Sequence, residues 1–200
     1  MLITFSGIDG SGKSTLARAL QAELERKQIA SRVSVPDYRS YDVLKQYCFR
    51  RFGDEYAFYL QVGPNLALSS LTLDWLQWWM EQVLDGPETS IICCDRYLID
   101  MYAQAVRLGA ELAPLVDVLQ PLPSPDFSFM LDLDPRTAAD RIANRISVPP
   151  NASETPAELA LLQNAFQVAA SQLHWDFTTT IDANRAPQEI IGDVLSTIGV

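Results

Sequence analysis

Residues 7–14 satisfy the pattern G-x-x-x-x-G-K-[ST], whose glycines, lysine and hydroxyl have the spacing needed to hold phosphate groups. The glycines let backbone N–H groups turn inward around phosphate oxygens. Lys13 would then place a positive charge beside the β- and γ-phosphates, and the Ser14 hydroxyl would bind Mg²⁺. An apolar run precedes the loop and a helical pattern follows it, which is the context that this motif needs. We therefore predict a nucleoside triphosphate site made by Gly7, Gly10, Ser11, Gly12, Lys13, Ser14 and Thr15.

Asp9 lies inside this loop, where a carboxylate would repel phosphate. We therefore expect Asp9 to face a hydroxyl or amine of a second substrate, and a solvated loop acid is the alternative. The first of these two readings favours phosphoryl transfer to an acceptor over simple hydrolysis of the triphosphate.

A second candidate cluster ends the apolar run over residues 91–95. The carboxyl ends of parallel strands converge on the ligand crevice, so Asp95 would lie near Mg²⁺ and the transferred phosphoryl group. There it could hold a metal-bound water or accept the proton of the nucleophile. Arg96 follows it, and a planar guanidinium suits phosphate binding. The alternative is an Asp–Arg pair on the surface.

The elements that must position these residues alternate along the chain. Short apolar runs predict strands at residues 2–6, 32–35, 90–94, 127–133 and 177–181. Longer amphipathic runs predict helices at residues 13–27, 41–52, 64–84, 98–108, 135–146, 155–173 and 187–198. Strands that alternate with helices form a parallel sheet covered on both faces, so we expect an α/β fold.

Two of the predicted helices have recognisable starts. Asp134 precedes Pro135, and Thr155 precedes Pro156, which is the order of an N-cap and a proline at the first helical position. Asp134, and Asp132 before it, are therefore not assigned to catalysis. The stretch over residues 147–153 between these helices is expected to be a mobile loop.

The composition argues against several classes of protein. The chain has 200 residues, which suits a single domain spanning residues 1–200. A net charge of −10 argues against a nucleic-acid partner, and no uncharged apolar run has membrane-spanning length. Residues 1–5 are apolar but too short for a secretion signal. The three cysteines cannot all pair within the chain, so a reducing, cytoplasmic compartment fits best.

Several motifs together resemble the thymidylate kinase family of nucleoside monophosphate kinases. Residues 5–15 are similar to the family's opening F-E-G-x-D-G-x-G-K-[ST]-T, and residues 95–97 to its D-R-[YH] motif. Residues 125–135 resemble its P-D-x-x-x-x-L-D-x-x-P strand, residues 102–104 fall where it often has A-Y-Q, and residues 181–183 resemble its last strand. The resemblance spans most of the chain. It implies a P-loop NTPase-type three-layer sandwich with a five-stranded parallel sheet flanked by helices.

The resemblance also implies a reaction, the Mg²⁺-dependent transfer of the γ-phosphoryl group of ATP to a nucleoside monophosphate, dTMP by family resemblance. Asp9 would contact the 3′-hydroxyl of the acceptor, and Asp95 would act around Mg²⁺ and the acceptor phosphate. Arg39, in a segment that partly matches the family's F-P-x-R element, would bind phosphate as Arg96 does. With two candidates that depart from the family pattern, Asp74 and Arg145, the predicted acceptor-binding residues are Asp9, Arg39, Asp74, Arg96, Tyr97 and Gln104. The predicted catalytic residues are Lys13, Asp95, Arg96 and Arg145.

Two positions near the acceptor depart from the family pattern. Ser6 replaces the acid of F-E-G, and Asp74 stands in the helix where an arginine usually reads thymine. A carboxylate accepts hydrogen bonds and cannot donate them, so Asp74 would suit a base with an exocyclic amine, or an acceptor without a base. The alternative is a solvated Asp74 that reads no base.

The lid, expected around residues 141–155, is poor in basic residues. Arg141 would begin it beside ATP, and after Arg145 no lysine or arginine occurs between residues 146 and 184. Gly10 occupies the loop position where some family members have a catalytic arginine. Arg145 is therefore the candidate for the arginine that stabilises the transferred phosphoryl group, with an exposed helical arginine as the alternative.

Trp75, Trp78 and Trp79 fall on one face of the helix predicted over residues 64–84. Such a face forms core or a subunit contact more often than a platform for a base. Since the family dimerises through helices of this region, the resemblance implies a homodimer.

Two other functions stay open. A nucleoside kinase, or a kinase of another small molecule, would share the loop and the acid–arginine pair. A catalytically silent ATP-binding protein with a degenerate acceptor site would fit the thin lid and Asp74. A GTPase switch is disfavoured because the sequence has no N-K-x-D signature.

Overall fold

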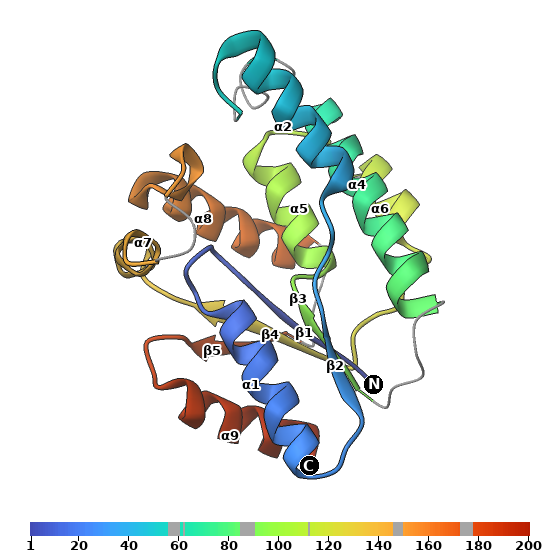
Figure 1. Cartoon of the computed structure of the whole chain (residues 1–200), viewed down its shortest axis with the longest axis vertical. Coiled ribbons are helices and arrows are strands. Elements are labelled where there is room, and N and C mark those ends of the chain that lie inside the picture. Colours follow the sequence, from blue (N-terminus) through green and yellow to red (C-terminus); the bar gives the residue numbers. More distant parts are fainter. Residues whose placement is uncertain (56–60, 62, 85–90, 112, 146–149, 173–177) are drawn as a thin grey trace.

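The computed structural model describes residues 1–55, 61, 63–84, 91–111, 113–145, 150–172 and 178–200, which form a three-layer α/β fold (Figure 1). The central layer is a sheet of five strands, β1 (Leu2–Gly7), β2 (Ser31–Ser34), β3 (Ile91–Asp95), β4 (Phe127–Asp132) and β5 (Thr178–Asp182). The strands lie in the order β2-β3-β1-β4-β5, and every neighbouring pair is parallel. The predicted fold class is confirmed, and all strands lie close to their expected positions.

Helices cover both faces of this sheet. One face carries α1 (Lys13–Arg26) and α9 (Pro187–Ile198), and the other carries α5 (Leu98–Arg107) and α8 (Pro156–Gln172) (Figure 1). Beside α5 lies α4 (Pro64–Trp79), which packs against α2 (Arg39–Phe52). The other helical segments are the π-helical turn η1 (Met80–Leu84), α6 (Ala113–Leu119), α7 (Pro135–Ala143) and the 3₁₀ turn η2 (Ala152–Glu154). Within the described ranges, no helix has the length and apolar character that crossing a bilayer requires.

The caps predicted for α7 and α8 are confirmed. Asp134 Oδ1 accepts the backbone N–H groups of Arg136 and Thr137 at 3.0 Å each, and Thr155 Oγ1 accepts the N–H of Glu158 at 3.3 Å. Asp134 therefore satisfies N–H groups that have no partner within the helix, the structural role expected for it.

Three helices differ from the sequence prediction. The prediction lacks α6, in which Leu115 and Leu119 lie one turn apart and are both buried. The regular part of α4 ends at Trp79 and continues as η1, and α7 ends at Ala143 rather than near residue 146. The loop predicted over residues 147–153 lies partly outside the described residues, and its described part includes the start of η2.

The core is centred on β1, which is buried at all six of its positions. Phe5 of β1 stacks on Phe129 of β4 with ring centroids 5.6 Å apart. This position in the middle of the sheet explains the apolar N-terminal run, because a parallel strand covered on both faces has no solvent side. The loop that follows β1 is therefore held at the centre of the carboxyl edge of the sheet.

The three tryptophans of α4 belong to this core. Trp75, Trp78 and Trp79 are at most 8% exposed, and their ring centroids lie 5.9, 6.5 and 6.4 Å from that of Tyr97. Their surface is therefore buried within the chain and is not available to a second subunit. Of the two alternatives for this face, core or subunit contact, the structure has the core. The homodimer implied by the resemblance stays a prediction.

Candidate active site

The phosphate-binding loop joins β1 to α1. Gly12 has a φ of +100° immediately before α1, and the Lys13 Nζ donates to the carbonyl oxygens of Gly7 and Ile8 at 2.8 Å each. Burial, followed by the charge of Arg96, lowers the pKa of Lys13 to about 8. The ammonium is thus held inside the loop by backbone oxygens, where the phosphates of a nucleotide would replace or supplement them.

Two glycines of the loop allow close contact with neighbouring elements. A Cβ at Gly7 would lie 2.7 Å from the carbonyl oxygen of Leu131, and one at Gly10 would lie 2.6 Å from that of Ala138 in α7. Both also have positive φ angles, of +141° and +81°. Some family members have a catalytic arginine at position 10, but here an arginine could not be accommodated unless α7 moved. In this chain the positive charge that stabilises the transferred phosphoryl group must therefore come from another residue.

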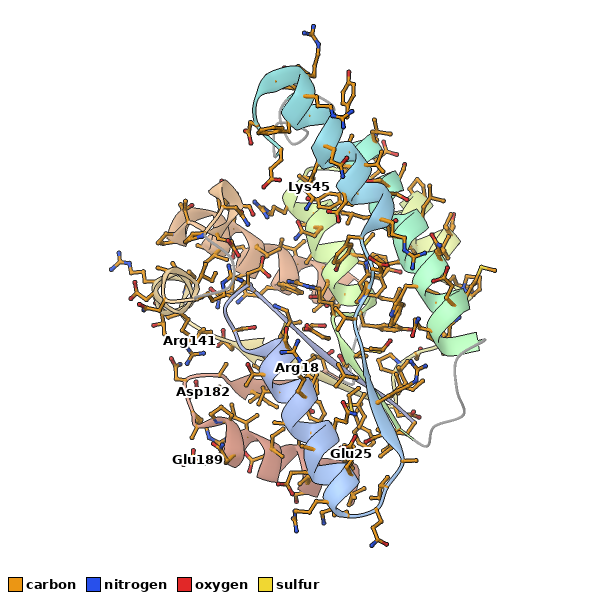
Figure 2. All side chains as sticks on the ribbon, viewed as in Figure 1. Arg18, Glu25, Lys45, Arg141, Asp182 and Glu189 are labelled. Carbon is orange, nitrogen blue, oxygen red and sulfur yellow. The ribbon has the colours of Figure 1, made fainter. Side chains whose placement is uncertain are left out.

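A donor pocket of about 510 Å³ opens over this loop and over the N-terminus of α1. Its walls are strongly basic, since Arg18, Arg96, Arg141, Arg145 and Arg185 all line it. Arg141 Nη2 donates to the carbonyl oxygen of Ala183 at 3.0 Å, and Figure 2 shows Arg141 close to Asp182 at the end of β5. The loop residues Asp9, Gly10, Ser11, Gly12, Lys13, Ser14 and Thr15 line the same pocket.

Ser14 and Asp95 meet beneath the donor pocket. Ser14 Oγ donates to Asp95 Oδ2, while Asp95 Oδ1 is buried and has no hydrogen-bond partner among the residues that the structure describes. A hydroxyl beside a carboxylate with a free buried oxygen fits a hard cation such as Mg²⁺. Among the residues that the structure describes, no group of three histidine, cysteine or acidic side chains could hold a metal ion. Phosphate oxygens of the nucleotide would therefore complete the coordination of a cation bound here.

Arg96 connects the donor pocket to a second pocket, because it lines both. Its Nη2 donates to Asp9 Oδ1, and Asp9 Oδ1 also lies 3.8 Å from Lys13 Nζ. Burial alone would raise the pKa of Asp9, but the charges of Arg96 and Lys13 outweigh it and hold that pKa well below its usual range. Asp9 is therefore an ion-paired carboxylate at the junction of the two pockets, and it is not a solvated loop acid.

The second pocket, which we call the acceptor pocket, encloses about 170 Å³ between α4, α5 and α8. Its apolar and aromatic walls include Tyr41, Leu71, Trp75, Met101 and Phe166, and its polar lining includes Asp9, Arg96, Asp100 and Gln104. Three buried polar atoms of lining residues have no hydrogen-bond partner among the described residues, the Trp75 Nε1 donor and the acceptors Asp100 Oδ1 and Gln104 Oε1. Such orphaned groups are costly unless a ligand satisfies them.

Asp100 is an acidic residue of this pocket that the sequence prediction missed. Its Oδ2 accepts the hydroxyl of Ser6 at 2.6 Å and the N–H of Tyr97 at 2.9 Å, and its Oδ1 lies 3.7 Å from Arg96 Nη1. Asp100 is only 5% exposed, and burial raises its pKa above the usual value. Asp100 is the third residue of α5 and its carboxylate accepts the N–H of the N-cap residue Tyr97, so it also has a structural role at the start of this helix. The signal in the sequence was therefore only an acid three residues after Tyr97, which by itself indicates a helix cap.

Two residues predicted to bind the acceptor, Arg39 and Tyr97, are placed elsewhere. Arg39 is exposed and pairs with Asp37 at 2.7 Å and Glu81 at 3.4 Å, outside the acceptor pocket. Tyr97 is fully buried, and its hydroxyl donates to the carbonyl oxygen of Pro123 at 2.8 Å. These two assignments are corrected because each side chain is committed to a contact away from the pocket.

Asp74 follows neither of the alternatives considered for it. It is 1% exposed, so it is not solvated, and it does not line the acceptor pocket. Its two oxygens accept the backbone N–H groups of Ser40 and Tyr41 at 2.7 and 2.9 Å. Asp74 is therefore a cap for the start of α2, and the prediction that it binds substrate is corrected.

The described part of the lid brings Arg145 to the donor pocket. Arg145 Nη2 lies 2.6 Å from Glu154 Oε1, and Glu154 Oε2 accepts the N–H of Asn151 at 2.9 Å. Glu154 is 7% exposed, so this carboxylate is a fixed anchor for the arginine. Residues 146–149, in the middle of the expected lid, lie outside the described residues.

Comparisons with known sequences identify relatives over most of the chain, although no family profile matches it. The chain is 32% identical over 147 residues to a probable thymidylate kinase of Sulfurisphaera tokodaii, which covers 70% of this chain and 67% of that one. It is 25% identical over 197 residues to the probable thymidylate kinase 1 of Saccharolobus solfataricus, which covers 98% and 96% of the two chains. It is 27% identical over 203 residues to the thymidylate kinase of Leptospira borgpetersenii.

Among solved structures, a deoxyadenosine kinase from M. mycoides has a similar fold. The TM-score is 0.69 at 15% sequence identity, and the match covers 100% of this chain and 99% of that one. At this identity the likeness concerns the fold alone, and it agrees with a P-loop kinase architecture. Given the sequence relatives and the phosphate-binding loop, this chain belongs to the thymidylate kinase family.

Proposed function

We propose that this chain transfers the γ-phosphoryl group of ATP to a nucleoside monophosphate, with dTMP as the acceptor that its relatives' names indicate. The observation that carries the proposal is the position of Arg96, which lines the donor and the acceptor pocket together. A guanidinium at that junction can bind the phosphate groups of both substrates and bring them into line.

The chemistry would rest on charge placement. An oxygen of the acceptor phosphate attacks the γ-phosphorus, the bond to the β–γ bridging oxygen breaks, and ADP leaves. Lys13 and the loop N–H groups would hold the β- and γ-phosphates, and Arg96 and Arg145 would stabilise the charge on the transferred group. Ser14 and Asp95 would hold Mg²⁺, which when bound neutralises phosphate charge.

The base of the acceptor would be read by atoms that now lack partners. The Trp75 indole can donate one hydrogen bond and Gln104 Oε1 can accept one. The imide edge of thymine offers the complementary pair, a carbonyl oxygen and a ring N–H. Trp75 would thus supply the hydrogen-bond donor to thymine that Asp74, as a carboxylate, cannot supply. The presence of Asp74 in place of the family's arginine is then no argument against a thymine acceptor.

We further propose a homodimer built on the outer face of α4 and α2. Leu66, Leu73 and Met80 follow one another at seven-residue spacing and are 54%, 61% and 58% exposed, and Val43 of the neighbouring α2 is 68% exposed. Exposed apolar side chains that recur at seven-residue spacing lie on one side of a helix and indicate an interaction surface. Sedimentation equilibrium of the purified chain tests the dimer, and a monomer at all concentrations contradicts it.

The three free buried cysteines, Cys48, Cys93 and Cys94, support a reducing compartment such as the cytoplasm.

We also propose that residues 1–200 form one kinase domain whose lid spans about residues 141–155. The proposal is supported by Arg141, Arg145 and Glu154, which connect α7 and η2 to the donor pocket. Nucleotide-dependent protection of this segment in hydrogen exchange is the expected result, and unchanged exchange contradicts a lid that closes.

The activity is tested by incubating the purified chain with ATP and Mg²⁺ and a panel of deoxynucleoside monophosphates, with ADP as the measured product. We expect dTMP to be phosphorylated, and Lys13→Ala to remove the activity. If no acceptor yields ADP above the background without acceptor, while an ATP analogue still binds, the chain is a silent ATP-binding protein and the kinase proposal is wrong.

A further inference from the structure

The acceptor pocket has an unusual charge balance for a site that receives a phosphate dianion. Asp9 and Asp100 line it, and Arg96 is the cation between them. The other lining arginine, Arg107, is paired with Glu158 at 2.6 Å. In the part of the chain that the structure describes, each cation of the pocket lining therefore already has a carboxylate partner.

Arg39 does not correct this balance. It is the arginine that sequence similarity offered for the acceptor phosphate, but it is paired with Asp37 and Glu81 outside the pocket. A monophosphate would therefore have to compete with Asp9 and Asp100 for Arg96.

Asp100 itself has one oxygen to spare. Its Oδ2 accepts hydrogen bonds from Ser6 and Tyr97, whereas its Oδ1 is buried, has no hydrogen-bond partner in the described part of the chain and lies 3.7 Å from Arg96 Nη1. The side chain is 5% exposed and lines the pocket. Ser6 and Asp100 are 94 residues apart, so two elements cooperate to hold a carboxylate at this place.

We propose that the acceptor pocket also takes an unphosphorylated nucleoside, and that Asp100 accepts the proton of its hydroxyl group. The inference rests on the proposed function only for the donor, ATP. The nucleoside oxygen forms a bond to the γ-phosphorus, the bond to the β–γ bridging oxygen breaks, ADP leaves, and the hydroxyl proton passes to Asp100 Oδ1.

The two acceptor classes differ in what a carboxylate does for them. A phosphate oxygen near neutral pH is already ionised and has no proton to lose, so Asp100 only repels it. A hydroxyl must lose its proton as it attacks, and a positioned carboxylate can take it. A free buried carboxylate oxygen beside Arg96 is therefore useful for an uncharged acceptor and a disadvantage for a charged one.

The test compares both acceptor classes in the same assay. The purified chain is incubated with ATP and Mg²⁺ and with thymidine, deoxycytidine, deoxyadenosine or deoxyguanosine, and separately with their monophosphates, and products are separated by chromatography. We expect at least one nucleoside to be converted to its monophosphate. Asp100→Asn should lower kcat for that nucleoside by about 100-fold or more, the usual contribution of a general base. The same variant should lower kcat/KM for the monophosphate by a much smaller factor, because a phosphate oxygen has no proton to give to Asp100 and only the contact of Asp100 with Arg96 is changed.

Asp117→Asn on α6 is the matched control, because it removes the same charge at an exposed position outside both pockets. Nucleotide binding and thermal unfolding of Asp100→Asn show whether the variant is folded. Monophosphates phosphorylated without any nucleoside turnover would overturn this inference and leave the proposed function standing. Nucleosides phosphorylated without monophosphates would do the reverse, and failure of both classes would overturn both. Equal losses on both acceptors in a folded variant would remove the role of Asp100.

Discussion

The Asp74 carboxylate of α4 accepts the backbone N–H of Ser40 at 2.7 Å, so that a side chain of one helix caps another. The first N–H groups of a helix have no partner within it, and the N-cap of α2, Tyr38, provides no side-chain acceptor. Asp74 supplies that acceptor and thereby fixes α2 beside the acceptor pocket, to which Tyr41 of its first turn contributes.

Replacing this cap should affect stability more than selectivity. We expect Asp74→Ala to lower the free energy of unfolding by about 2 kcal/mol, the upper range for loss of a helix cap. Urea denaturation measures the change, and Asp37→Ala, which removes an exposed acid nearby, should alter it by less than about 0.5 kcal/mol. A stable Asp74→Ala variant with a changed preference among nucleotide bases would show instead that Asp74 reads the base.

The contact between Ser14 and Asp95 predicts how the reaction depends on a divalent cation. With Asp95→Asn, kcat should fall by about 100-fold or more, because one anionic ligand and its electrostatic contribution are lost. Titration of the activity with Mg²⁺ should require higher concentrations in the variant, whereas binding of an ATP analogue in EDTA should change little.

Asp132→Asn is the corresponding control. Asp132 also ends a strand of the sheet, but it is exposed and bonded to Gln163 at 2.8 Å. Its replacement should leave kcat and the Mg²⁺ requirement as they are. An unchanged Mg²⁺ requirement in Asp95→Asn would exclude this carboxylate as a metal ligand.

Arg145 should matter for the rate because Gly10 cannot be replaced by an arginine against α7. We expect Arg145→Ala to lower kcat by about 1000-fold, the lower range for a catalytic arginine, with a small effect on the KM for ATP. Arg136→Ala, which removes an exposed arginine at the start of α7 and outside the donor pocket, is the control. Steady-state kinetics measures kcat of both variants. If kcat of Arg145→Ala equals that of Arg136→Ala, Arg145 is a surface residue of the lid without a catalytic role.

The strands and the donor half of the site could be predicted from the sequence because their signals are local. The loop at residues 7–14 is contiguous, and parallel topology alone brings the end of β3 beside it, so Lys13, Ser14 and Asp95 were expected together. Asp134 and Thr155 likewise act on N–H groups a few residues away.

The acceptor half could not be predicted in the same way. Sequence spacing gives the position of a residue along a helix or strand, but it does not give which other element its side chain contacts in the fold. Tyr97 turns into the tryptophan cluster, Arg39 turns outward, and Asp74 turns toward the start of α2. Each outcome depends on a partner from another element. Asp100 was missed for the same reason, since its partner Ser6 lies on a different strand.

The Asp9–Arg96 pair predicts how stability changes with pH. The pKa of Asp9 is depressed in the folded chain, so the unfolded chain binds a proton more readily. This carboxylate therefore stabilises the fold at pH values above its unfolded pKa of about 4, and that contribution is lost as the pH falls toward the folded pKa. Asp9→Asn should lower the free energy of unfolding by about 2 kcal/mol near neutral pH, as expected for a hydrogen bond between charged groups.

The difference between the wild type and Asp9→Asn should stay constant from about pH 7 to about pH 5 and shrink as the pH falls below about 4, because the unfolded wild type then binds a proton at Asp9 while the folded chain does not. Thermal unfolding at a series of pH values measures it, with Asp117→Asn as the exposed control whose difference from the wild type should stay small throughout. A difference for Asp9→Asn that does not shrink as the pH falls would mean that Asp9 contributes through shape and neutral hydrogen bonding. In that case Arg96 would be held mainly by Asp100, and the charge at the junction of the two pockets would have to be reassigned.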